Sequence, residues 1–261
     1  MADRDKIIRY FRASGDEDLA SHLVDLAEHA RKTGRYQVSD FLDPHGLNVA
    51  EIVAANFENI HLETQGGFPG AERQRAAFIT TDFPGKVDFN LTGFLVQWDQ
   101  RYYHLGHRDI LGAFMGIGCK REVLGDIVVL ENGAQFVCEQ ALGNYITANL
   151  TTVGAAAVTL TEVPVTELKA REEKVKVISA TVAALRLDAV AAAGYGTSRS
   201  RMAEEIKGQN VKVNWQDVKN AAQAVKEGDV LSFRGRGRVE IAEVRGMTKK
   251  GRLSITLKRY L

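Results

Sequence analysis

Basic side chains and serines between residues 186 and 238 form the clearest set of residues whose types suit a chemical task. Arginine and lysine neutralise phosphates, and hydroxyl and amide groups bond to phosphate and sugar oxygens. This chemistry is binding of a polyanion. Charge alone does not separate RNA from DNA or a membrane surface. The candidate contact residues are Arg186, Ser198, Arg199, Ser200, Arg201, Lys207, Lys212, Asn214, Lys219, Arg234, Arg236 and Arg238.

The charge of the chain is unevenly distributed, although the net value is only +1. Residues 186–261 hold 16 Lys and Arg against 8 Asp and Glu, whereas the rest holds 18 against 25. A tail of charge +8 on a body of charge −7 is typical of a protein in which one module binds a polyanion.

Two motifs resemble catalytic or cofactor-binding loops, but the residues around them do not fit those functions. His107-Arg108-Asp109 resembles the catalytic loop of protein kinases, but Phe114 occupies the position of the required Asn. The run GIGCKREVLGD follows no strand, and Gly125 interrupts the helix that a dinucleotide loop should open. The body has no evident pairing of a nucleophile with a base, so the sequence predicts no catalytic residue. The turn at residues 120–122 remains a candidate RNA contact.

Composition sets further limits. Cys119 and Cys138 are too few for a four-ligand zinc site and are expected as core thiols, so neither a metal nor another cofactor is predicted. The chain lacks an apolar run long enough for a membrane span, and its charged start does not resemble a secretory signal, so a cytoplasmic location is expected. No small-molecule substrate is indicated.

Helix signals surround the basic residues. We expect a short helix from Arg186 to Ala193, ended by Gly194 in the left-handed conformation. Thr197 or Ser198 should cap a second helix, and Val211 to Val213 should form a strand. Arg199 lies near the apolar stripe of the second helix on a helical wheel, so packing and phosphate contact both remain open for it.

This order of elements resembles the RNA-binding module named after the fourth small-subunit ribosomal protein, the S-four domain. The match is carried by RLD (186–188), SRSR (198–201), KG (207–208), VKVN (211–214) and VKEGDVL (225–231), with Trp215 where many members carry Gly. The resemblance implies that the two helices form a basic surface on structured RNA, and that Gly228-Asp229 turns the chain into the closing strands. Arg234, Arg236 and Arg238 are expected on the rim of a hairpin rather than in an RGG-like arm.

The remaining pattern predicts an α+β chain of three domains. Helical spacing predicts a helical N-terminal domain over residues 1–74. A β-α-β-β-α-β order, with a hairpin at Asn132-Gly133, predicts a ferredoxin-like (RRM-like) middle domain over residues 75–165, opened by an extra strand at Ala77 to Thr81. Its two inner strands, expected to contain IVVL and QFVCE, lack the exposed aromatic pattern of RNA-recognition domains. A charged segment, a linker or docking strand, leads to the S-four domain at residues 182–261.

Nearly the whole chain resembles the YlmH-like family of bacterial RNA-binding proteins, through FLDP, HLGHRDILGAFMGIGCKREVLGDIVV, the residues from 186 to 201 and TKKGR. Members in phototrophs are labelled photosystem II S-four proteins. The resemblance implies a non-catalytic protein that binds structured rRNA, with tRNA as a further candidate, at the large ribosomal subunit during rescue of stalled nascent chains. An RNA-modifying enzyme is the alternative, because S-four domains also accompany pseudouridine synthases and methyltransferases. Pseudouridine synthases present a catalytic Asp in a tripeptide similar to that at residues 186–188. A methyltransferase would need a glycine-rich cofactor loop, and none is visible in this sequence.

Overall fold

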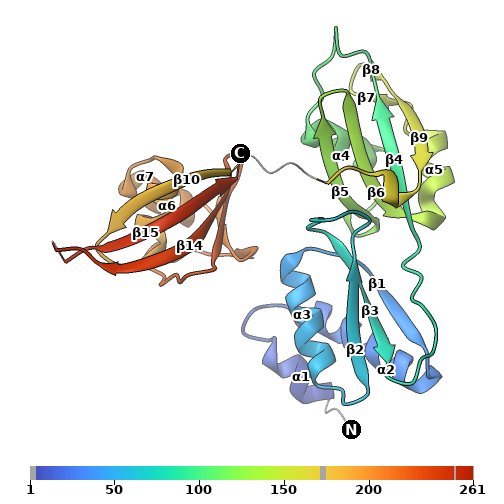
Figure 1. The fold of residues 1–261 in the computed structure, drawn as a ribbon, viewed down its shortest axis with the longest axis horizontal. Helices are drawn as coiled ribbons and strands as arrows, with labels where there is room; N and C mark the ends of the chain where they lie inside the picture. The colour runs from blue at the N-terminus through green and yellow to red at the C-terminus, as the bar shows by residue number, and fades with distance from the viewer. Residues whose placement is uncertain (1–3, 171–174, 250, 261) are drawn as a thin grey trace. The chain divides into compact units, whose positions relative to one another are not determined.

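The computed structural model describes residues 4–170, 175–249 and 251–260 (Figure 1). The chain divides into two compact units, residues 1–171 and residues 172–261. The first unit contains an N-terminal and a middle domain that share contacts, and the second is a single small domain. Helices and sheets occur together in the described parts of both units, which confirms the α+β class.

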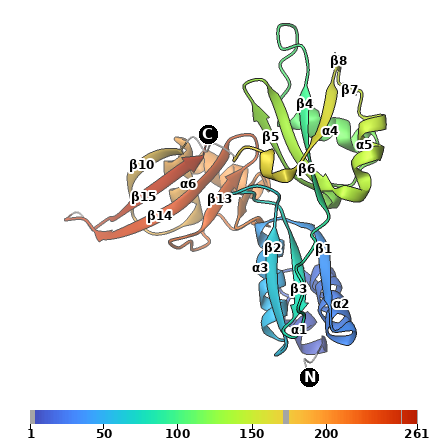
Figure 2. The ribbon, with the colours of Figure 1, turned by 45° about the vertical axis from the view of Figure 1, so that its right-hand side comes forward.

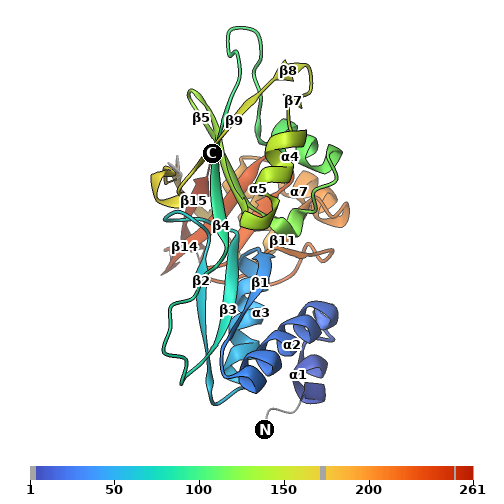
Figure 3. The same cartoon turned by 90° about the vertical axis from the view of Figure 1, so that its right-hand side faces the viewer.

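Over residues 4–80 the chain forms a three-stranded antiparallel sheet with three helices on one face (Figure 3). The elements are α1 (Arg4–Tyr10), α2 (Glu17–Thr33), β1 (Tyr36–Leu42), α3 (Pro44–Ala55), β2 (Ile60–Gln65) and β3 (Gln74–Thr80). The sheet order is β1-β3-β2, which makes β3 the central strand. Leu23, Val53 and Phe78 belong to the core that joins the helices to the sheet.

The expectation of a purely helical N-terminal domain is therefore wrong. Three helices are present, and Asp43 caps α3 by accepting a hydrogen bond of 2.9 Å from the Gly46 N–H. The strand expected at Ala77 to Thr81 pairs with β1 and β2, not with the middle domain. Nearly all of β3 is buried, Arg75 and Thr80 included, so its sequence lacks the apolar–polar alternation that would identify it as one strand of a half-exposed sheet.

Over residues 91–163 a four-stranded antiparallel sheet carries α4 and α5 on one face (Figure 3). The elements are β4 (Leu91–Gln97), α4 (His107–Gly116), β5 (Leu124–Leu130), β6 (Gly133–Glu139), α5 (Gly143–Asn149), the hairpin of β7 (Thr152–Val153) and β8 (Ala156–Ala157), β9 (Thr159–Val163), and 3-10 turns η1 (Arg121–Val123), η2 (Gln140–Leu142) and η3 (Val165–Glu167). The main elements follow the predicted β-α-β-β-α-β order, and the strand order is β5-β6-β4-β9. The inner strands are β6 and β4, so the expectation that IVVL lies in an inner strand is wrong: it belongs to the edge strand β5.

An aromatic cluster joins these helices to the sheet. The rings of Phe94 and Phe136 stack with centroids 5.0 Å apart, and the Phe114 ring of α4 meets Phe136 edge-on at 4.7 Å. The predicted hairpin between β5 and β6 is present, although its turn lies one residue earlier, because Gly133 already pairs with Leu130. A Cβ at Gly133 would lie 2.3 Å from a backbone oxygen of β4, so the chain needs glycine at this position.

The other face of the middle sheet is covered by chain segments. Phe41 and Phe68 of the N-terminal domain and Leu168, which follows η3, pack with Val128 and Val137 in one core. The loop between β2 and β3 reaches this sheet (Figure 2). Aromatic stacking of bases on this face, as RNA-recognition domains use it, is therefore closed off.

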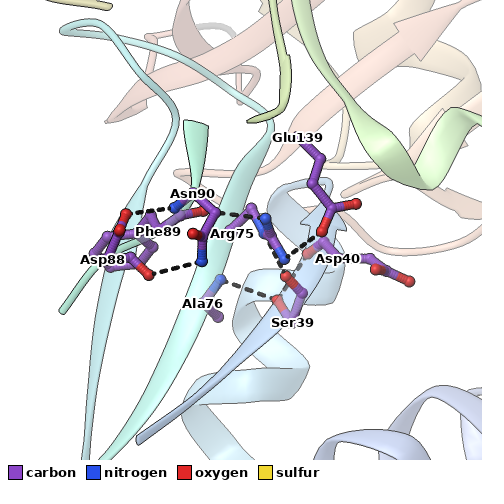
Figure 4. A network of polar contacts seen from close by, with 8 residues as sticks. All are labelled: Ser39, Asp40, Arg75, Ala76, Asp88, Phe89, Asn90 and Glu139. Atoms are coloured by element: carbon purple, nitrogen blue, oxygen red, sulfur yellow. Dashed lines mark hydrogen bonds and ion pairs between the residues drawn. The ribbon is translucent and has the colours of Figure 1, made fainter. Parts of the chain in front are cut away.

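Polar contacts strengthen the junction of the two domains. Arg75 of β3 donates from Nε to the Ser39 carbonyl at 2.7 Å and from Nη1 to the Phe89 carbonyl at 3.0 Å, and its Nη2 lies 3.3 Å from Glu139 Oε1 of β6 (Figure 4). Nearby, the Arg73 guanidinium donates to backbone carbonyls on both sides of the junction, among them those of Phe41 and Leu124. The first unit is therefore held by a shared core and by buried charge-assisted hydrogen bonds.

The second unit packs α6 and α7 against a sheet of order β10-β15-β14-β13-β11-β12. The elements are β10 (Val175–Val182), α6 (Leu187–Tyr195), α7 (Arg199–Lys207), β11 (Val211–Val213), β12 (Gln216–Asp217), β13 (Val230–Phe233), β14 (Gly237–Met247) and β15 (Leu253–Tyr260). The segment expected as a linker or docking strand thus ends in a true strand, which pairs with β15 along its whole length. Its residues 171–174 lie outside the described part of the chain.

The end of α6 differs from the prediction. Gly194 lies inside the helix, and Gly196, with φ of 63°, is the left-handed residue that ends it. A Cβ at position 194 would lie 2.7 Å from Val239 Cγ1 of β14. Gly194 is therefore needed for close packing, whereas Gly196 is needed for its backbone conformation.

Candidate nucleic-acid interface

Asp188 joins the amino ends of α6 and α7. Its carboxylate accepts hydrogen bonds from Arg186 Nε and Nη2, at 3.2 and 2.9 Å, and its Oδ2 lies 3.1 Å from Arg199 Nε. Asp188 is only 4% exposed, whereas the side chains of Arg186 and Arg199 remain 40% and 53% exposed. Arg199 therefore braces the helix pair, and part of its guanidinium still faces solvent.

The environment of Asp188 keeps it ionised. Burial acts to raise its pKa, but the hydrogen bonds from Arg186 and Arg199 outweigh burial and hold the pKa below its ordinary value. The result is a buried anion between two cations, so the cluster keeps a net positive charge. Its outer surface is suited to a phosphate.

Ser198 begins α7 as predicted. Its hydroxyl oxygen accepts a hydrogen bond of 3.2 Å from the Arg201 N–H, and it lies 3.3 Å from the Ser200 hydroxyl. Both serines are exposed beside the Asp188 cluster. They lie at the amino end of a helix, where partial positive charge favours an anion.

Four predicted cations are exposed and have no ion pair among the described residues: Arg201, Lys207, Lys219 and Arg234. The backbone N–H of Arg234 donates to the Asn210 carbonyl at 2.9 Å, so the β13–β14 turn lies beside the carboxyl end of α7. Lys219 precedes Ala221, whose carbonyl accepts a hydrogen bond of 3.0 Å from the Asp188 N–H. These cations therefore extend the surface from both ends of the helix pair.

Asn214 has a structural task instead. Its side chain donates to Asp229 Oδ1 and accepts from the Val230 N–H, both at 2.9 Å. Asn214 and Trp215 form the two-residue turn between β11 and β12, with φ of 49° and 66°, which is the backbone of a type I′ turn. Trp215 thus adopts a conformation that favours the glycine many S-four domains carry there. Next to this turn, Lys212 Nζ forms an exposed ion pair with Asp217 at 3.4 Å.

Arg236 and Arg238 lie on the predicted hairpin rim but meet aromatic rings. Arg236 lies over the Phe233 ring at 5.6 Å, and Arg238 lies over the Tyr260 ring at 4.9 Å. Val239 points into the core, so strand alternation places Arg238 on the sheet face opposite α6 and α7. Arg238 is therefore not part of the surface formed by the helices.

Three family models match successive parts of the chain. Residues 15–83 match the model described as "YlmH, N-terminal", residues 84–167 match "Putative RNA-binding domain in YlmH", and residues 185–231 match the S-four domain. The chain is 37% identical over 229 residues to ribosome-associated protein quality control protein P2 of Bacillus subtilis, covering 86% of this chain and 88% of that protein. The chain belongs to the YlmH-like family.

A solved structure supports the fold of this family member. The cell division protein ylmH of Streptococcus pneumoniae matches with a TM-score of 0.51 and 23% identity, covering 59% of this chain and 93% of that one. The match to the N-terminal model ends at residue 83, and the match to the next model begins at residue 84. The strand β3 therefore lies within the N-terminal match, in agreement with its pairing to β1 and β2.

The YlmH-like chain uses its apparent catalytic motifs structurally. Asp109 accepts a hydrogen bond of 2.8 Å from the Gly106 N–H and closes the first turn of α4. Asp188 is enclosed by two arginines. Arg121 points inward and donates to the carbonyls of Leu124 and Gly125 at 3.0 and 2.9 Å, and burial lowers its pKa to about 10. Arg121 is therefore engaged by the protein itself and no longer belongs to the candidate RNA contact at residues 120–122.

No cluster of three or more His, Cys, Asp or Glu side chains suited to a metal ion occurs in the described residues. In the same part of the chain, no helix has the length and apolar character needed to cross a membrane. Cys119 and Cys138 are buried thiols, and burial raises the pKa of both, that of Cys138 to about 12.

The sequence analysis did not identify Tyr195, a buried residue that supports the interface from the interior of the domain. Tyr195 is buried, and its hydroxyl lies 2.7 Å from the Leu231 carbonyl and 3.0 Å from that of Gly237. These contacts join α6 to the hairpin that carries Arg234 and Arg236. The only available signal was a tyrosine in an otherwise alanine-rich helix.

Proposed function

We propose that this protein is a non-catalytic RNA-binding factor that contacts structured rRNA at the large ribosomal subunit, in the cytoplasm, during rescue of stalled nascent chains. The observation that carries the proposal is the basic surface formed by α6, α7, the β13–β14 turn and Lys219, which follows β12. We call it the helix-pair surface, and it comprises Arg186, Ser198, Arg199, Ser200, Arg201, Lys207, Lys219 and Arg234.

The arrangement supports recognition by shape and phosphate contact. Asp188 holds the guanidinium groups of Arg186 and Arg199, and Tyr195 ties α6 to the hairpin that carries Arg234, so the backbone that presents these cations is ordered before RNA arrives. A preorganised backbone loses little conformational entropy on binding. An A-form duplex offers phosphates and 2′-hydroxyls rather than accessible base edges in its deep groove, which suits such a surface.

We infer in addition that the middle domain has a ferredoxin-like fold. Its order β4-α4-β5-β6-α5-β9 and its strand order β5-β6-β4-β9 support this. Association with ribosomes is supported by the relative in Bacillus subtilis, which is named a ribosome-associated quality control protein. The structural roles of Asp109 and Asp188 favour a binding function over an RNA-modifying one.

The first experiment measures binding of the full-length protein to duplex RNA over a range of salt concentrations. Arg201→Glu and Lys207→Glu should each weaken binding at least tenfold, and the neutral variant Lys207→Gln should reduce the salt slope by roughly one, as expected for a lost phosphate contact. Arg245→Glu is the matched control, because it makes the same charge change on β14, outside the helix-pair surface, where Arg245 pairs with Glu243. Equal losses in all the charge reversals would indicate a nonspecific charge effect and refute the surface.

The ribosome part of the proposal is tested by gradient sedimentation of cell lysate. Wild-type protein should travel with the large subunit, and the triple variant Arg201→Glu, Lys207→Glu and Arg234→Glu should remain at the top. Unchanged sedimentation of the triple variant would place ribosome binding elsewhere on the chain.

A further inference from the structure

The loop from β4 to α4 in the middle domain carries exposed aromatic and basic side chains that the proposed function does not use. It projects beyond the end of the sheet (Figure 1). Tyr102 is 75% exposed and Tyr103 36%, and the Arg101 guanidinium lies 5.5 Å from the centre of the Tyr102 ring. Two exposed rings in succession give this loop an aromatic surface that is open to a ligand.

The loop is held in one conformation by its own hydrogen bonds. The Asp99 carbonyl accepts from the N–H groups of Tyr102 and Tyr103 at 3.4 and 3.1 Å, and Trp98 Nε1 donates to the Tyr103 carbonyl at 3.1 Å. The rings are therefore presented on a fixed turn. A ligand that stacks on them meets a surface that is already ordered.

Two cations, Arg101 and Arg108, and two carboxylates, Asp99 and Asp109, lie around the rings. Asp99 is bound by Arg101, with Nη2 to Oδ2 at 2.7 Å, and Asp109 is engaged by the Gly106 N–H. Arg108 is exposed and has no ion pair among the described residues. Beside it lies a shallow open hollow whose lining includes Tyr103, Leu105, Arg108, Asp109, Gly112 and Gly154.

We propose that this loop is a second RNA contact that stacks an unpaired base on Tyr102, with the adjacent phosphate held by Arg108. Stacking on an aromatic ring beside cations is the usual mode of binding single-stranded nucleic acid without sequence preference. The covered face of the middle sheet cannot supply such a platform, whereas the loop lies within residues 84–167, which match the model described as a putative RNA-binding domain. The inference rests on the RNA-binding function proposed above and assigns it a second site.

The test uses full-length protein and a single-stranded oligonucleotide that contains 5-iodouridine, which crosslinks to stacked aromatic rings under ultraviolet light. The crosslink should map to the peptide holding Tyr102 and Tyr103. In a binding assay with the same oligonucleotide, Tyr102→Ala should lower affinity about tenfold and Tyr102→Phe should retain it. Tyr10→Ala is the control, because Tyr10 is 68% exposed on α1.

Two further arms separate this proposal from the previous one. Tyr102→Ala should leave duplex binding unchanged, while the triple variant of the helix-pair surface should lose duplex binding and keep the crosslink at Tyr102. Crosslinks confined to residues 186–238, or equal affinity of Tyr102→Ala and Tyr10→Ala, would overturn the loop site alone. Loss of ribosome association in Tyr102→Ala without any crosslink would assign the loop to a protein partner and also overturn it.

Discussion

Arg199 Nε lies 3.1 Å from Asp188 Oδ2, so the first residue of α7 is tied to the first turn of α6. Its neighbour Arg201 points outward on the same helix and has no ion pair among the described residues. Two arginines two positions apart thus have different tasks, and substitutions can separate stability from binding.

We expect Arg199→Ala to lower the free energy of unfolding by about 1–2 kcal/mol, because it removes a charge-assisted hydrogen bond from a buried carboxylate. Arg201→Ala should change it by less than about 0.5 kcal/mol while weakening RNA binding. Urea unfolding and RNA binding on the same samples test both. Equal stabilities of the two variants would contradict the bracing role.

The second prediction concerns acid pH. The folded-state pKa of Asp188 is below its ordinary value, so its ion pairs stabilise the fold above that value, and this stabilisation is lost as the pH falls through the folded pKa. Asp188→Asn should therefore be less stable than wild type by about 1.5–3 kcal/mol at pH 6, and the difference should shrink as the pH is lowered below the ordinary aspartate pKa of about 3.9. Urea unfolding over this pH range measures it. A difference that stays constant with pH would show that the charge of Asp188 is irrelevant.

The third prediction tests the contact of α6 with β14. Gly194→Ala should destabilise the second unit by about 1–3 kcal/mol, because the new methyl group would overlap the side chain of Val239. Val239→Ala should cost stability by itself, and the double variant should lose less than the sum of the two single changes. Additive losses in this double-mutant cycle would mean that the contact is absent.

The fourth prediction concerns the junction inside the first unit. Arg75→Met should lower stability by about 2–4 kcal/mol, because it leaves the Ser39 carbonyl and Glu139 without their buried donor. Proteolysis within residues 81–90, which join the domains, should become faster. Arg101→Met is the control, because that arginine is exposed and pairs with Asp99. Equal cleavage rates in both variants would show that Arg75 does not hold the domains together.

Local signals predicted the second unit well. The capping serine at 198, the apolar stripe of Met202 and Ile206 and the strand at Val211 act through neighbours in sequence, and all lie as expected. The end of α6 was placed two residues early, since Gly194 and Gly196 look alike in sequence and only the packing on Val239 distinguishes them.

Long-range pairing could not be predicted from the sequence in the first unit. β2 alternates weakly, with only Ile60 fully buried, and β1 contains an irregularity between Val38 and Phe41 that disrupts its period. In the candidate site, residue types identified the cations but could not show that Asp188 engages Arg186 and Arg199, or that Asn214 is occupied by Asp229. These partners are set by the tertiary fold.

The core shared by the first two domains limits how the chain can be divided into fragments for experiments. A fragment that begins after residue 83 would lack Phe41 and Phe68 and would leave Val128 and Val137 open to water. Such a fragment should aggregate rather than report on RNA. For the same reason, residues 4–170 should be expressed as one piece, although a border between the two domains is easily drawn along the chain.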